Sequence, residues 1–255
     1  MSNTLVMSKE VLMEKSKSEM KQGIEVPSRS KREKVALTCA ILFSQGHDSG
    51  LAGQITARAD EEGVYYTQPF GHGFDEISTD NLLKVDVHLN VVAGDGVPNP
   101  ANRFHSWIYQ ARPDVNCIIH THPTHISALS MLAIPLKVAH MDTCLLYDDI
   151  AFLESWPGVP VGNEEGKIIS GVLGKKRAAL LAHHGLVIAG RSVEEACMLA
   201  IQCERAAKLQ LLAQSAGEIK DIDPGLAKEA HDWVLQEKRS QLGFEYYCRR
   251  IERSF

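Results

Sequence analysis

Two short apolar runs that end in histidine constrain the fold of this chain most strongly. The first is VNCIIH at residues 115–120, and the second is AALLAHHG at residues 178–185. Neither run alternates apolar with polar residues, and both are short, so each predicts a buried strand. Because several segments with helical spacing surround them, the chain is predicted to have an α/β fold.

The strands and helices mix without a regular β-α-β repeat, which favours one α/β domain with a largely antiparallel sheet. Residues 1–30 are polar and poorly patterned, and predict a mobile arm before a single domain at 31–255. Strands are expected at 50–59, 62–69 and 83–96, with shorter ones at 136–139 and 144–147, and helices at 31–45, 102–111, 124–132, 167–173, 192–215 and within 224–253, besides a helical turn at 78–83.

Composition excludes several classes of protein. The net charge of −5 argues against nucleic acid as a main partner, which needs a basic surface. No apolar run reaches the roughly 18 residues of a membrane span, and the first residues do not resemble a secretory signal. We therefore expect a cytoplasmic protein with neither nucleic acid nor a membrane as a partner. The six cysteines form no C-x-x-C pair and predict buried thiols.

The histidines at the strand ends are candidate metal ligands. In CIIHTHPTH, His120 and His122 lie two residues apart, so both imidazoles can point to one side of an extended segment. In LLAHHGLV, either His183 or His184 could supply a third nitrogen. Spacing alone leaves open a core histidine beside a surface one. A three-histidine site would suit zinc first, and also manganese, cobalt, iron or nickel.

Three stretches resemble the class II aldolase/adducin family. They are GLAGQITAR, YQARPDVNCIIHTHPTHISALS and LLAHHGLVIAGRSVEEACMLAIQCERAAKLQLLA, and they occur in the family's order. The resemblance implies a three-layer α/β/α fold with a central, mostly antiparallel sheet, and a homotetramer. It also implies a divalent metal, zinc first, held by His120, His122 and His184. In such enzymes the metal stabilises an enolate beside a carbonyl.

The chain departs from the sugar-phosphate enzymes of that family at the acid/base position. Where they carry an acidic residue after two serines, this chain has Ala101 after Asn99 and Pro100. The family asparagine of the phosphate site is Gln54, and a proton-donating tyrosine is replaced by Met141. Alanine cannot move a proton, and proline offers phosphate neither a hydroxyl nor an N–H.

These departures favour a metal-dependent carbon–carbon lyase, of aldolase or decarboxylase type, acting on a small, non-phosphorylated carbonyl or carboxylate substrate. The alternative is a non-catalytic, adducin-like domain that binds metal or a cytoskeletal protein such as actin; because the chain stops soon after the domain, we expect adducin's basic tail to be absent. The candidate catalytic residues are His105, Arg103 and Asn102, with Arg103 as a possible carboxylate clamp. Less favoured candidates are His125, His140, His183, Asp142, Asp148, Asp149, Tyr246 and Tyr247.

Overall fold

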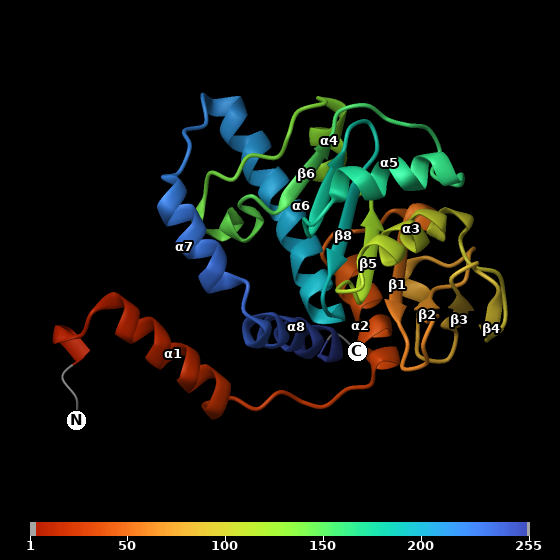
Figure 1. The fold of residues 1–255 in the computed structure, drawn as a ribbon, viewed down its shortest axis with the longest axis horizontal. Coiled ribbons are helices and arrows are strands. Elements are labelled where there is room, and N and C mark those ends of the chain that lie inside the picture. The colour runs from red at the N-terminus through yellow and green to blue at the C-terminus, as the bar shows by residue number, and fades with distance from the viewer. Residues whose placement is uncertain (1–3, 254–255) are drawn as a thin grey trace.

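A computed structural model describes residues 4–253. In that range eight strands form one sheet in the order β4-β3-β2-β1-β5-β8-β7-β6 (Figure 1). Neighbouring strands run antiparallel except β6 and β7, which run parallel, so the prediction of a mostly antiparallel sheet is confirmed. The strands are β1 (Gln54–Arg58), β2 (Val64–Thr67), β3 (Leu83–Asp86), β4 (Val91–Ala93), β5 (Cys117–Thr121), β6 (Ile150–Leu153), β7 (Ala178–Leu181) and β8 (Leu186–Gly190).

Helices cover both faces of this sheet, as the α/β/α prediction requires. Alternate residues of β5 divide between two apolar cores, with Ile119 in one and Ile118 in the other. Figure 1 shows α3 (Arg103–Ala111) and α5 (Asn163–Leu173) over the face turned to the viewer, with α2 (Lys31–Ser44) and α6 (Val193–Ala216) behind. On that far side α4 (Thr124–Met131) and α8 (Glu237–Glu252) pack against α6, and α7 (Pro224–Val234) lies beside a 3-10 helix, Met141–Leu146.

Most elements expected from the sequence are present, and three expectations were wrong. Residues 136–139 form no strand, and 144–147 fall largely in the 3-10 helix Met141–Leu146. Cys144, Leu145 and Leu146 are therefore buried as part of this short 3-10 helix and not as part of the sheet. Residues 79–81 form a turn instead of a helical segment. The strand β6 has no counterpart among the elements expected from the sequence.

The N-terminal segment contains a helix that has no counterpart among the elements expected from the sequence. This helix, α1 (Lys9–Gly23), has no buried residue and lies apart from the body in Figure 1. An ion pair between Lys9 of α1 and Glu229 of α7 connects this helix to the rest of the protein. The division into an arm and a single domain stays a prediction. Within residues 4–253, no helix is both long and apolar enough to cross a membrane.

Candidate metal centre

His120 is the most deeply buried of the three candidate ligands. It lies on β5 with 1% of its surface exposed. Its Nδ1 is 2.8 Å from the carbonyl oxygen of Leu186 on β8, which can only accept a hydrogen bond. The ring proton therefore resides on Nδ1, and the lone pair of Nε2 is available to a metal.

His184 reaches the same point through the tight turn that joins β7 to β8. His183 has a φ of 56°, a left-handed conformation that turns the chain so that its own side chain is exposed while His184 faces His120. A Cβ at Gly185 would lie 2.3 Å from His122 Cδ2, so only glycine allows the His122 ring to rest there. The structure thus brings His184, and not His183, to His120 and His122.

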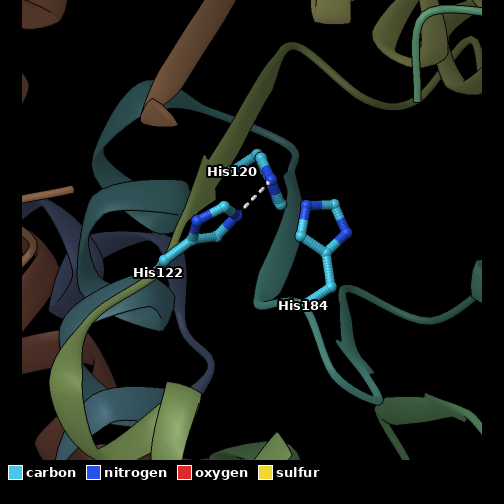
Figure 2. Close-up of side chains that lie close together, drawn as sticks. All are labelled: His120, His122 and His184. Carbon is cyan, nitrogen blue, oxygen red and sulfur yellow. Dashed lines mark hydrogen bonds between the residues drawn. The ribbon is translucent and has the colours of Figure 1, made fainter. Parts of the chain in front are cut away.

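The three imidazoles form one compact cluster, as Figure 2 shows. The Nε2 atoms of His120 and His122 are 2.9 Å apart, and the ligand nitrogens of all three residues lie within 4.8 Å of one another. A tetrahedral ion with bonds of about 2.0–2.1 Å spaces its ligand nitrogens roughly 3.4 Å apart. Small side-chain rotations therefore suffice to bring the three nitrogens to the spacing that such an ion requires.

The electrostatics of the cluster favour neutral rings. Burial lowers the pKa of His184 to about 4, and also lowers the pKa of His122. Burial and then the neighbouring His122 and His184 hold the pKa of His120 well below its usual value. At neutral pH all three rings keep the lone pairs that metal coordination needs. Among the described residues, this is the one group of three or more histidine, cysteine or carboxylate side chains close enough to hold a metal ion.

The comparisons with known proteins agree with this architecture. The profile of the family described as the class II aldolase and adducin N-terminal domain matches residues 33–211. The chain belongs to this family. Its relatives include proteins named as a decarboxylase, as L-fuculose phosphate aldolases and as an adducin, so membership alone leaves the activity of this chain undecided.

Three relatives illustrate that range. The decarboxylase NovR of Streptomyces niveus is 31% identical over 182 residues, which cover 70% of this chain and 67% of the relative. Mouse alpha-adducin is 32% identical over 184 residues, which cover 68% of this chain and 25% of adducin. The structure of an L-fuculose 1-phosphate aldolase from Glaciozyma antarctica PI12 superposes with a TM-score of 0.80 at 28% identity, covering 90% of this chain and 94% of the aldolase.

Two of the three predicted catalytic residues of this family member face the sheet beneath α3. His105 is 1% exposed, its Nδ1 lies 2.8 Å from Thr56 Oγ1, and burial lowers its pKa to about 3, so the ring is neutral at pH 7. Asn102 is fully buried and donates from Nδ2 to Thr67 Oγ1 at 3.0 Å. The Phe104 ring lies edge-on to His105 and to His120. A proton-transfer role for His105 stays a prediction.

Arg103 differs from these two residues because it is half-buried and has no partner. Its guanidinium makes no hydrogen bond or ion pair with any residue between 4 and 253. An unpaired guanidinium at the start of α3 is available to an anionic group of a ligand.

The three carboxylates among the less favoured candidates, Asp142, Asp148 and Asp149, do not join the histidine cluster. Asp149 precedes β6 and pairs with Arg177, which precedes β7. Because β6 and β7 run parallel and His184 follows β7, Asp148 and Asp149 are at the opposite end of these strands. Asp142 is exposed and pairs with Arg205. His125 binds Glu204, His140 caps the 3-10 helix that follows it, and Tyr246 and Tyr247 lie together on α8.

The histidine cluster leads to a first prediction. His120→Ala and His184→Ala should each lose stoichiometric metal, because two nitrogens cannot replace a three-nitrogen site. Metal content after dialysis, measured by inductively coupled plasma mass spectrometry, checks this. His88→Ala, which removes an exposed histidine in the turn between β3 and β4, is the control and should retain metal. Equal metal in all four proteins, wild type included, would contradict the site.

Proposed function

We propose that this chain is a divalent-metal-dependent carbon–carbon lyase, with His120, His122 and His184 as ligands and zinc as the expected ion. The observation that carries the proposal is the cluster of three neutral imidazoles within 4.8 Å, which the chain keeps although Ala101 stands where the resemblance places the family's acidic residue. A bound divalent ion supplies Lewis-acid stabilisation of negative charge that develops next to a carbonyl.

The residues at the family's phosphate position support a non-phosphorylated substrate. Asn99 donates from Nδ2 to the Leu51 carbonyl and accepts from the Ala101 N–H at 2.9 Å, so its oxygen and one of its two amide hydrogens are occupied. Gln54 donates from Nε2 to the Ala52 carbonyl at 2.6 Å, which leaves an acceptor oxygen. Pro100 has no N–H. Asn99, Gln54 and Pro100 carry no hydroxyl and no positive charge, and Asn99 and Gln54 each already donate one amide hydrogen within the protein, so this position is poorly suited to a phosphate dianion.

Decarboxylation suits this site better than aldol cleavage. Loss of CO₂ leaves its bonding electron pair on the substrate, so no base has to remove a proton from carbon or oxygen at that step. Ala101 cannot supply such a base, and Asp148 and Asp149 lie at the far end of β6 and β7. We assign Arg103 as the group that binds the substrate carboxylate, and Asn102 and His105 as the buried polar floor beside it. The similarity to a decarboxylase of Streptomyces niveus is in line with this choice.

The second candidate function is a non-catalytic, adducin-like binding domain. It is favoured by Ala101 and by the 32% identity to alpha-adducin. The three histidines favour the lyase, since neutral rings held together at a buried position are more than a binding surface needs.

Activity separates the two candidates. A panel of small keto acids, hydroxy acids and aromatic carboxylates should contain a substrate whose CO₂ release needs the metal, and chelation should abolish that release. Sugar phosphates should be poor substrates by comparison, and inorganic phosphate should inhibit the enzyme weakly. Absence of turnover across the panel, together with tight binding to actin filaments, would instead establish the adducin-like function.

Arg103 yields a prediction about substrate binding. Arg103→Ala should raise KM for a carboxylate substrate roughly tenfold to a hundredfold, the range expected when a charged hydrogen bond is lost. The matched control is Arg249→Ala, which removes an exposed arginine from α8. Steady-state kinetics with both variants check the assignment. An unchanged KM in Arg103→Ala would remove Arg103 from the site.

We further propose that the protein is a homotetramer. Two segments with exposed apolar residues lie at the end of the sheet that carries His184. One is the loop that follows β6, and the other is the end of α4, where the Ser130 carbonyl accepts a hydrogen bond from the His183 N–H. A surface of this kind favours burial against another subunit. The residues are Met131, Leu132, Trp156, Val159 and Val161.

Light scattering tests the assembly. Wild type should have four times the chain mass, and Leu132→Asp should have a lower mass because a charge cannot be buried in an apolar contact. Val92→Asp, at an exposed position of the edge strand β4, should leave the mass unchanged. A monomeric wild type would contradict the tetramer.

A further inference from the structure

The loop at residues 45–53, between α2 and β1, contacts the H-x-H segment at two points. The His122 N–H donates to Ser49 Oγ at 2.7 Å. On the neighbouring residue, Thr121 Oγ1 lies 2.8 Å from His47 Nδ1. The same short loop therefore holds the backbone of one candidate ligand and the side chain of the residue between the two ligands.

His122 needs such a contact more than His120 does. Thr121, opposite Leu186, is the last residue of β5 to pair with β8, so the His122 backbone lies outside the ladder. The His120 ring is fixed by the Leu186 carbonyl. For the His122 ring, the one hydrogen bond within the described residues joins it to His120 itself. Its placement thus depends on its backbone, which Ser49 holds.

His47 contacts β5 from the face opposite to His120. It is 1% exposed, and Thr121 is fully buried, so this hydrogen bond is shielded from water. Successive side chains of a strand point to opposite faces, so Thr121 points away from the face that carries His120. The hydrogen bond fixes the position of the end of β5 relative to the loop that follows α2, and it involves neither the His120 nor the His122 ring.

The loop is itself held on its other side. Gln68 donates from Nε2 to the Gly53 carbonyl at 2.6 Å, and Gln54 donates to the Ala52 carbonyl. Asn99, next to the segment that carries Ala101, donates to the Leu51 carbonyl at 3.3 Å. A loop anchored at three successive carbonyls is a rigid support for the H-x-H segment.

We propose that Ser49 and His47 are positioning residues for the metal, setting the backbone of His122 so that its ring meets those of His120 and His184. This inference rests on the proposed metal centre. Supporting groups of this kind typically change metal affinity by about tenfold to a hundredfold when removed.

Cobalt titration of the purified full chain tests the proposal. Ser49→Ala should weaken Co²⁺ affinity by about tenfold to a hundredfold and alter the visible absorption of bound Co²⁺, which reports its coordination geometry. Ser49→Thr, which keeps the hydroxyl, should restore both. His47→Ala should behave like Ser49→Ala, and His47→Asn, which retains a polar atom near the Nδ1 position, should recover part of the affinity. Leu51→Ala, at an exposed position of the same loop, should match wild type.

The outcomes separate this inference from the proposed function. Wild type that binds no Co²⁺ would overturn the metal centre and the positioning role with it. Wild-type affinity and spectrum in Ser49→Ala and His47→Ala would overturn the positioning role alone. If Ser49→Ala does not fold, as judged by circular dichroism, Ser49→Gly removes the same hydroxyl and serves as the test. Loss of affinity that Ser49→Thr does not restore would also count against the role of the hydroxyl.

Discussion

The antiparallel pairing of β5 with β8 is the interaction on which the site depends. It places His120 opposite Val187 and Thr121 opposite Leu186. The Leu186 carbonyl then fixes the His120 ring, and the turn before Leu186 carries His184. A slip of one residue would turn His120 to the other face of the sheet. Register is strongly specified here, because β5 and β8 are buried along their whole length and divide their side chains between two apolar cores.

Local sequence pattern was enough to predict the strands β5 and β7 and the two histidines at the end of the first apolar run. The apolar runs identify β5 and β7, and the spacing of His120 and His122 places both at the end of one strand. The choice between His183 and His184 was beyond spacing, because it depends on the left-handed φ of 56° at His183. The family resemblance supplied His184. The carboxylates near residue 148 were likewise beyond pattern, since the direction of β6 relative to β7 determines which end of the sheet they occupy.

The support from the 45–53 loop could not be predicted from the sequence either. Ser49 and His122 are 73 residues apart, and a serine in a glycine-containing loop is common without any role in a site. The need for such a contact can be recognised once every backbone N–H near the site has been assigned an acceptor. The His122 N–H lies beyond the last ladder pair, and a partly buried N–H without a partner is costly, so a side chain must supply its acceptor. Sequence separation hides that partner until the loop and the strand are placed together.

The polar groups beside His120 are held at a cost to stability. Gln54 Oε1, Asn102 Oδ1 and His105 Nε2 are buried and receive no hydrogen bond from any described residue. Each unsatisfied group costs roughly 1–3 kcal/mol. Thr56, opposite Thr67 on β2, bonds His105, while Thr67 bonds Asn102, so the two partly satisfied groups sit over one rung of the sheet. The apolar cores on both faces must offset this cost. The stability of the region therefore comes from its packing, whereas its polar groups carry the chemical character of the site.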